Sequence, residues 1–425
     1  MQKHRLAGAY AAACLAGALV PGAAQATDGY FQPGYSVRSV GMGGVGIALP
    51  QDALAAAANP AGMALVGDRF DAGLTVFRPD RKAQIDGVSY SGNAQSNFLI
   101  PELGYNRMLR RDLSLGISVY GNGGMNSGYS SIDPRTGLLP GAGVDLQQMF
   151  ISPSVAWRVN SDNTIGIAVD LVHQTFRANG LDNFARPQLS IDPSSLQAPG
   201  HDSSNGVGVR IGWIGQLAPG VSVGATFQPK IHMGKFGAYR GLFADGGSFD
   251  IPANYGVGVA WQAAPRWLLA ADVERILYSG VSAIANPSSP LLTLAMHQPA
   301  PLLGAPGGAG FGWSDVTVFK LGAAWRYSDA LTLRAGWNHT DNPVNSANVF
   351  FNTIAPGVVQ NHLTLGLSYA VSRHVEVSAD YVHAFHNSVP GFAPKLDSQG
   401  NIVGQLSESL SMSQDALGLS IGYKF

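Results

Sequence analysis

From residue 69 to the C-terminus, hydrophobic and polar side chains alternate along a series of short segments. The clearest segment ends the chain, where one parity holds Leu417, Leu419, Ile421, Tyr423 and Phe425 and the other holds small or polar residues. The same alternation recurs at 165–171, 207–213, 255–261, 331–338, 363–369 and 375–381. A period of two predicts β-strands with one apolar face, and segments of roughly 9 to 14 residues suit tilted strands that cross a bilayer.

The two faces of these strands differ in charge and in aromatic content. Charged residues fall on the less apolar parity: Asp170, Arg210, Lys230, Asp272, Glu274, Lys320, Arg334, Glu376 and Asp380. The apolar parity ends in aromatic residues, as interfacial girdles do: Trp213, Trp261, Trp267, Trp325, Trp337, Tyr369 and Tyr423. A basic residue facing lipid at mid-membrane costs about 2–4 kcal/mol. The charged parity is therefore predicted to line a lumen.

The connections between the segments alternate in length. Short ones lie at 110–112, 160–163, 218–220, 263–266, 328–330 and 372–374, and long ones at 79–96, 122–144, 178–204, 237–251, 278–314, 342–358 and 388–410. This pattern is typical of a bacterial outer-membrane barrel with short periplasmic turns. We predict an all-β fold, a 14-stranded antiparallel transmembrane β-barrel over residues 69–425. Pro101 and Pro153 require local irregularity in the second and fourth strands.

The N-terminus reads as an export signal. Lys3 and Arg5 precede an apolar run at 6–20, and small residues end at Ala26, so residues 1–26 are predicted to be a signal peptide. Cys14, the one cysteine of the chain, lies in this run; a lipoprotein reading stays open, although the apolar run continues past the cysteine. No later apolar stretch is as long as the roughly 18 residues that a membrane helix needs. We expect the outer membrane of a Gram-negative bacterium.

Residues 27–68 show neither the alternation of the strands nor the pattern of an export signal. They are rich in glycine and alanine, with Asp52 placed to cap a helix over 53–58 and Asn59-Pro60 placed to end it. A segment this small cannot bury enough apolar surface to fold alone, and a barrel this wide has a lumen that admits water unless something fills it. We therefore predict that residues 27–68 form a hatch, or plug, inside the barrel.

The hatch also carries a resemblance. Gly41-Met42-Gly43-Gly44, Gln51-Asp52-Ala53 and Asn59-Pro60-Ala61-Gly62-Met63 resemble the hatch of the FadL/TodX/OmpP1 family of outer-membrane channels for hydrophobic compounds. The hatch residues singled out are Gly41, Gly43, Gly44, Asn59 and Pro60.

The resemblance implies a function without a chemical step. We expect passive uptake of hydrophobic molecules, long-chain fatty acids first, by lumen binding, hatch rearrangement and lateral release into outer-membrane lipid, with no cofactor. Aromatic or aliphatic hydrocarbons are the alternative cargo, and a lipid-acting enzyme or an adhesin is the alternative class. The net charge of −1 gives no basic surface for nucleic acid. A closed barrel leaves no sheet edge to pair, so a monomer is expected.

Family members have a kinked third strand that opens a gap in the barrel wall. Here the predicted third strand, 113–120, is followed by Gly121, Asn122, Gly123 and Gly124. Glycines at a strand break suit such a kink, so these four residues are the candidates for a lateral gate. The alternative reading is the start of a glycine-rich external loop.

Two further sets of residues are candidates for ligand contact. Arg210, Lys230, Lys320 and Arg334 are candidates to hold a ligand carboxylate in the lumen; the alternative is ion pairing within the wall, such as Lys320 with Asp272 and Glu274. An external apolar groove for first capture is predicted from Leu181, Phe184, Leu291, Leu292, Leu294 and Phe311. The alternative there is a packed extracellular cap.

Other motifs carry no chemistry. Gly41 to Gly46 matches the letters of a dinucleotide fingerprint, but no preceding strand and no βαβ unit accompany it. His383 and His386 are three residues apart on a strand and point to opposite faces, so they make a poor metal pair. No GxSxG elbow is present. We assign no catalytic residue and no metal ligand.

Overall fold

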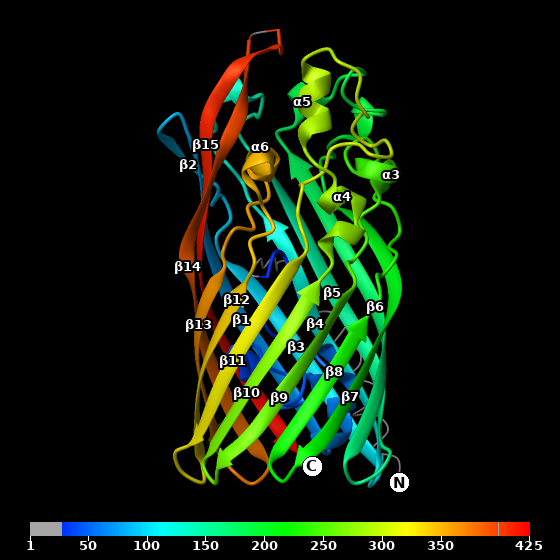
Figure 1. The fold of residues 1–425 in the computed structure, drawn as a ribbon, viewed down its shortest axis with the longest axis vertical. Coiled ribbons are helices and arrows are strands. Elements are labelled where there is room, and N and C mark those ends of the chain that lie inside the picture. The colour runs from blue at the N-terminus through cyan, green and yellow to red at the C-terminus, as the bar shows by residue number, and fades with distance from the viewer. Residues whose placement is uncertain (1–27, 398) are drawn as a thin grey trace, which may run out of the picture.

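The computed structural model describes residues 28–397 and 399–425, which form a tall barrel of tilted strands (Figure 1). The predicted signal peptide, with Cys14, lies outside the described residues. The barrel strands are β1 (Arg69–Ile85), β3 (Phe98–Arg110), β4 (Leu113–Asn126), β5 (Gly143–Arg158), β6 (Asn163–Asn179), β7 (Asp202–Ala218), β8 (Val221–Gln228), β9 (Asn254–Ala264), β10 (Trp267–Ile276), β11 (Val316–Arg326), β12 (Leu331–Thr340), β13 (Asn361–Ala370), β14 (Val375–Leu396) and β15 (Ile402–Lys424).

Each of these strands pairs with the next in the chain, and β15 closes the barrel on β1 from Lys424 to Glu408. The four-residue β2 (Val88–Ser91) pairs only with β1, inside the first long loop. The predicted 14-stranded antiparallel barrel is thus confirmed. Pro101 is accommodated within β3, and pairing between β5 and β6 pauses at Pro153 without a change of register.

Burial follows the predicted alternation. On β15, Leu417 and Leu419 are 53% and 59% exposed on the outer face, whereas the intervening Gly418 is buried. Aromatic side chains gather near strand ends on the outer face, where the rings of Trp267 and Trp325 stack 5.5 Å apart. An apolar surface of this kind is stable only against lipid, because in water it would favour aggregation.

The two ends of the barrel differ. Short turns and the C-terminus lie at the lower end in Figure 1, and the long loops rise at the upper end, with the β14–β15 hairpin the tallest. The loops contain short helices: α3 (Ala244–Gly247), α4 (Ser282–Ala285), α5 (Ser289–Ala295), α6 (Val349–Asn352) and the 3₁₀ turns η3 (Pro134–Thr136), η4 (Asp182–Phe184), η5 (Pro193–Ser195), η6 (Gly237–Tyr239), η7 (Tyr278–Gly280) and η8 (Ser346–Asn348). Among the described residues, no helix is both long and apolar enough to cross a membrane.

Residues 28–68 lie within the lower part of the barrel, drawn in dark blue in Figure 1. We call them the hatch segment. Its short elements are α2 (Val37–Val40), η1 (Ala55–Ala57) and η2 (Pro60–Leu65). The predicted helix over 53–58 was wrong: Asp52 does accept the Leu54 N–H at 3.0 Å, but only one 3₁₀ turn follows.

The hatch segment touches the wall where inward positions are glycine. A Cβ added at these positions would lie within 3 Å of hatch atoms, so backbone or side-chain atoms of the hatch lie directly against the backbone of the wall. The glycines come from nine strands: Gly104, Gly116, Gly166, Gly212, Gly224, Gly256, Gly322, Gly336 and Gly366.

Candidate functional site

The barrel wall has an unpaired stretch between β3 and β4. Pairing of these strands begins near the short turn and ends at Leu103 and Val119. Above that point β1 is the only strand that pairs with residues 98–102 of β3, and β5 is the only strand that pairs with residues 120–126 of β4. We call the space between these two free edges the side window. Pro101 suits it, because proline has no N–H to offer a neighbouring strand.

The predicted gate residues form the β4 edge of this window. β4 does not end at Tyr120, as predicted, but continues to Asn126, with a register shift between Gly121 and Gly123 that leaves Asn122 in a bulge. The Asn122 amide donates to Gln148 Oε1 at 3.1 Å, so the bulged side chain is fixed against β5. A bulge bends its strand and twists it away from its neighbour, which explains why β3 and β4 part here.

The N-terminal end of the hatch covers the window from inside. We call residues 28–35 the hatch end and residues 36–68 the hatch core. Tyr30 O accepts the Gly124 N–H at 3.0 Å, and the Gln32 N–H donates to Asn122 O at 3.1 Å. The Gln32 side chain donates to Gly121 O at 2.8 Å. The hatch end therefore takes up backbone groups that β3 leaves without partners.

This contact depends on a glycine. A Cβ at Gly123 would lie 1.8 Å from Tyr30 O, so no other residue fits at this position without displacing a backbone. The close approach of two backbones is the use that glycine has inside a strand.

The side chain of Tyr30 sits in an aromatic box. Its ring centroid lies 5.4 Å from Tyr278, 6.1 Å from Trp313 and 6.3 Å from Phe249, and the ring is fully buried. The Tyr278 hydroxyl accepts the Tyr30 N–H at 3.1 Å and donates to Asp28 O at 2.5 Å. Aromatic pairs at these distances each stabilise a contact by about 0.5–1.5 kcal/mol beyond area burial. The box therefore holds the hatch end in place over the window.

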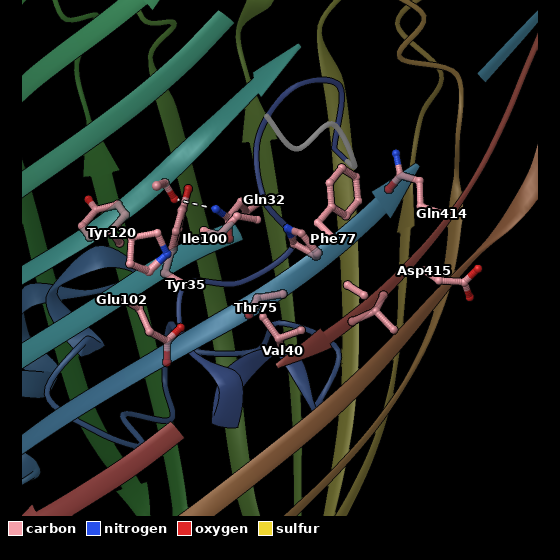
Figure 2. A pocket seen from close by; sticks show the side chains of 15 residues that line it. Gln32, Tyr35, Val40, Thr75, Phe77, Ile100, Glu102, Tyr120, Gln414 and Asp415 are labelled. Atoms are coloured by element: carbon pink, nitrogen blue, oxygen red, sulfur yellow. Dashed lines mark hydrogen bonds between the residues drawn. The ribbon is translucent and has the colours of Figure 1, made fainter. Parts of the chain in front are cut away.

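A cavity lies beside the window (Figure 2). Gln32, Tyr35 and Val40 of the hatch face Ile100 and the other cavity residues of β1, β3, β4, β14 and β15. The cavity is narrow: its volume of about 30 Å³ is room for about two water molecules. In this structure the route from lumen to window is closed.

The cavity carries no positive charge. Neither lysine nor arginine occurs among its 15 lining residues. Glu102 lines it and accepts the Val37 N–H at 3.1 Å. Asp415 also lines it, but its side chain is exposed and bonds Tyr381 and His383 on the outer face.

Two predicted lumen cations, Arg210 and Lys320, face inward and contact polar groups of the wall. Arg210 is 2% exposed and donates to Gln228 at 2.5 Å and Asn254 at 3.1 Å. Lys320 is 5% exposed and pairs with Glu274 at 2.9 Å. Lys320 therefore forms an ion pair within the wall, which was the alternative to holding a ligand carboxylate.

The other two predicted cations differ from one another. Arg334 is buried and donates to Ser368 at 2.7 Å. Lys230 lies beyond the strand on which it was predicted, because β8 ends at Gln228. Its ammonium is 3.8 Å from Asp250 in the following loop. Proline at 229 has no N–H for the sheet, which accounts for the early end of β8.

The predicted hatch residues hold the hatch core to the wall. Gly41 lies backbone to backbone against Gly366, and the Gly43 N–H donates to Thr364 Oγ1 at 2.8 Å. Gly43 and Gly44 have φ of 74° and 82°, a left-handed turn that favours glycine.

Asn59 and Pro60 fix the far end of the core. The buried Asn59 amide donates to the carbonyls of Ile47 at 2.7 Å and of Trp213 on β7 at 3.0 Å, while its oxygen accepts the Ala61 N–H at 3.1 Å. Pro60 starts η2 and lies against Gly166 of β6.

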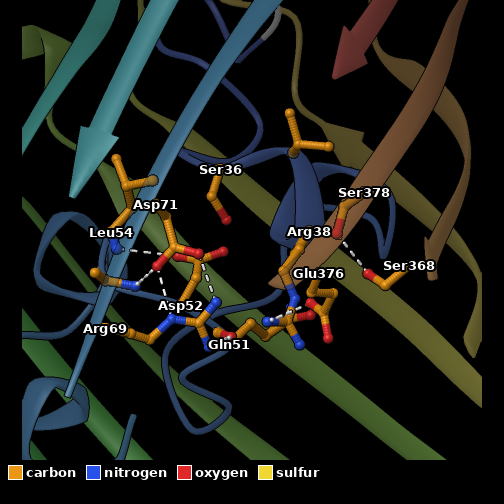
Figure 3. A network of polar contacts seen from close by, with 12 residues as sticks. Ser36, Arg38, Gln51, Asp52, Leu54, Arg69, Asp71, Ser368, Glu376 and Ser378 are labelled. Carbon is orange, nitrogen blue, oxygen red and sulfur yellow. Dashed lines mark hydrogen bonds and ion pairs between the residues drawn. The ribbon is translucent and has the colours of Figure 1, made fainter. Parts of the chain in front are cut away.

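Charged groups fix the same core (Figure 3). Arg69 of β1 holds Asp71 with a 2.7 Å hydrogen bond from Nε, and Asp71 accepts the Ala53 N–H at 2.9 Å. On β14, which is separated from β1 only by β15, Glu376 pairs with Arg38 of α2 at 3.0 Å. Hydrogen bonds to charged groups are the stronger kind. The hatch core is therefore anchored by ion-assisted contacts, whereas the hydrogen bonds between the hatch end and the window join neutral groups.

The predicted external groove residues come together in the loops. Leu181, Phe184 and Leu291 line one apolar cavity, and Phe184, Leu291 and Leu292 line a second of about 220 Å³. Leu294 is partly buried against the same apolar cluster. Phe311 lies apart from both cavities, 2% exposed, with its ring 6.3 Å from that of Trp313.

Sequence reasoning missed the aromatic box and the coupling of Tyr30 to the window. The box joins residues 248 positions apart, for which alternation has no signal. One local sign was present: Tyr30 and Phe31 are adjacent large aromatics in a segment that is rich in glycine and alanine.

The chain matches a family model along most of its length. A family model described as "Outer membrane protein transport protein (OMPP1/FadL/TodX)" matches residues 17–425. The chain belongs to this family. The FadL/TodX family comprises transport proteins of the outer membrane, so the chain is an outer-membrane channel for hydrophobic compounds.

Solved structures share the fold at low identity. The Pseudomonas putida toluene transporter TodX is 19% identical with a TM-score of 0.65, over 92% of this chain and 99% of that one. A Pseudomonas aeruginosa FadL homologue is 18% identical with a TM-score of 0.67, over 93% and 99%. The Ralstonia pickettii toluene transporter TbuX is 20% identical with a TM-score of 0.63, over 92% and 99%. No curated relative matches the chain.

Proposed function

We propose that this channel passes hydrophobic molecules from its lumen through the side window into the outer membrane, without a cofactor. The observation that carries the proposal is the pair of free edges between β3 and β4, covered from inside by the hatch end. Movement of residues 28–35 would join the narrow cavity to the window. The hatch core would stay in place and keep the lumen closed to water.

The physical reason for a side exit lies in the solubility of the cargo. A hydrophobic molecule that left the barrel into the aqueous periplasm would lose its apolar surroundings. Release into lipid keeps about 0.8 kcal/mol for each buried CH₂ group. The external cavities around Phe184 and Leu291 would serve first capture, because they offer apolar walls above the barrel.

The aromatic box gives the hatch end a means to respond to cargo. Tyr30 places an aromatic ring among Tyr278, Trp313 and Phe249. A cargo molecule that enters this box competes with the Tyr30 ring, and displacement of the ring weakens the backbone hydrogen bonds that follow it along the chain.

Charge bears on the identity of the cargo. Long-chain fatty acids remain one candidate, as the family resemblance suggested, and hydrocarbons are the other. Of the four predicted lumen cations, the three on strands are already engaged by wall partners, and the cavity by the window has no basic residue. We favour uncharged molecules of the toluene class, which the transporters TodX and TbuX are named for. The proposal needs one chain only, in outer-membrane lipid.

The test is uptake through a channel whose hatch end is locked. Gln32→Cys with Gly121→Cys replaces two contacting residues, and a short reducible thiol crosslinker would join them. The described residues contain no other thiol. In cells that lack their own importers, we expect uptake of radiolabelled toluene above that of oleate. The crosslink should abolish it and reduction should restore it, while each single cysteine variant treated with the same reagent is the control. Full uptake by the crosslinked channel would refute the side route.

A further inference from the structure

The upper end of β4 is held to the barrel without β3. Beyond the side window, the Gly128 N–H donates to Gly92 O at 2.9 Å and the Ala94 N–H donates to Gly128 O at 3.0 Å. These two bonds join the end of β4 to the segment 92–97 that precedes β3. We call this junction the upper seam. It forms the boundary of the window on the extracellular side.

One side chain spans the upper seam. Arg81 of β1 is 1% exposed and is the largest of the fully buried side chains among the described residues. Its guanidinium donates to Asn93 Oδ1 at 3.2 Å, to Asn126 Oδ1 at 2.9 Å, and to the carbonyls of Asn126 and Gln95. It also lies 5.7 Å from the centre of the Phe98 ring, at the start of β3. Arg81 therefore contacts both sides of the window at its upper end.

The partners of Arg81 are all neutral. Within the described residues no carboxylate forms an ion pair with it, and each acceptor is an amide or a carbonyl. A buried charge without an ion pair is a poor source of stability, since its removal from water is costly. What arginine adds is a rigid, planar set of donors that fixes several acceptors at once. The geometry thus favours a positioning role.

We infer that Arg81 is a positioning residue that fixes the upper seam and so sets the size of molecule that the side window releases. This inference rests on the proposed side exit. With Arg81 in place the free edges of β3 and β4 end at the seam. Without it the separation of β4 extends toward the loops, and the window admits bulkier molecules.

The test uses Arg81→Met, which keeps length and removes the donors, and Arg81→Lys, which keeps the charge and loses the planar fork. Lys82→Met is the matched control, because Lys82 is the next residue, on the outer face, with an exposed ion pair to Asp80. Hydrogen exchange at the amides of Ala94 and Gly128 should rise about tenfold in both Arg81 variants, as for loss of one or two hydrogen bonds. Uptake of triisopropylbenzene relative to toluene should rise with it.

A disulfide across the upper seam should restore the size limit that Arg81→Met removes. An added Cβ at Gly128 would lie 3.0 Å from the Ala94 Cβ, and disulfides need a Cβ separation of about 3.8 Å, so a small shift accommodates Ala94→Cys with Gly128→Cys. In the Arg81→Met background the oxidised pair should restore the size limit and the reduced pair should not.

The outcomes separate the two proposals. Wild-type channels that take up no hydrophobic molecule would refute the proposed function. Wild-type uptake with a size limit that Arg81→Met leaves unchanged, or unchanged exchange at the upper seam, would overturn the role of Arg81 alone.

Discussion

Gly123→Ala should detach the hatch end from the window. The added Cβ would lie 1.8 Å from Tyr30 O and 3.1 Å from Phe31 Cα. Both are backbone positions, so neither can rotate away. β4 is held along its length by β5, with Gly123 paired to Gln148. The hatch end is not paired along a strand and is held by the aromatic box and a few hydrogen bonds, so it is the hatch end that moves.

The magnitude follows from the interactions that this movement breaks. Two backbone hydrogen bonds, from Gly124 to Tyr30 and from Gln32 to Asn122, contribute about 0.5–1.5 kcal/mol each. One aromatic contact of Tyr30 with Tyr278 contributes a similar amount. Their sum is about 3 kcal/mol. Since about 1.4 kcal/mol is a factor of ten in an equilibrium constant, the detached population should rise about a hundredfold.

Hydrogen exchange measured by mass spectrometry tests this directly. The peptide covering residues 28–36 should lose protection in Gly123→Ala, while peptides of β9 to β12 should not change. Toluene uptake should become faster and less dependent on toluene concentration. Gly200→Ala is the control, because nothing lies within 4 Å of a Cβ added at that loop glycine. Unchanged protection of residues 28–36 would show that the hatch end does not rest on β4, and would refute the reasoning.

Three further predictions concern the rest of the hatch. Asp272→Ala removes the carboxylate that accepts two N–H groups of the hatch core, one of them from Ile47 at 3.0 Å. This change should lower the free energy of unfolding, measured by urea titration, by about 3 kcal/mol. Asp272→Asn should lower it less, and equal decreases for the two variants would contradict this. Asn59→Ala should cost about 2 kcal/mol by the same measurement, with Asn59→Asp, which keeps the cap, in between. Burial raises the pKa of Asp28 to about 7 against the opposing effect of Lys320. The attachment of the hatch end should therefore be strongest below about pH 4 and weaken as pH rises to 7, and Asp28→Asn should abolish this trend in exchange of residues 28–36.

The barrel could be predicted because the bilayer imposes a rule on every strand. Side chains facing lipid must be apolar, so alternation such as that from Leu417 to Phe425 recurs along the chain and indicates strands. The six short and seven long connections between the segments then give fourteen strands, the number in the barrel. Neither signal depends on contacts between distant residues.

The window could not be predicted in full, because its parts lie far apart in sequence. Gly121 to Gly124 lack alternation and so resembled a loop, but here the strand edge is completed by Tyr30 and Gln32 rather than by a neighbouring strand. Lys230 was placed on a strand by parity alone, which does not reveal where Pro229 ends β8. Parity gave the inward direction of Arg210 and Lys320 but not their partners.

The division of the hatch into a charged anchor and a neutral end bears on how the channel opens. To free the hatch core, the partly buried Arg38–Glu376 pair and the contacts of the buried Asp272 must break inside the lumen. Leaving a buried charge such as Asp272 without its partners costs about 3–5 kcal/mol. Loosening the hatch end at the window, by loss of two backbone hydrogen bonds and one aromatic contact, takes about 3 kcal/mol. A small hydrocarbon that buries four or five carbons supplies about that much, at about 0.8 kcal/mol per carbon. Such a cargo can therefore move the hatch end but not the hatch core. Water supplies no such energy and moves neither part.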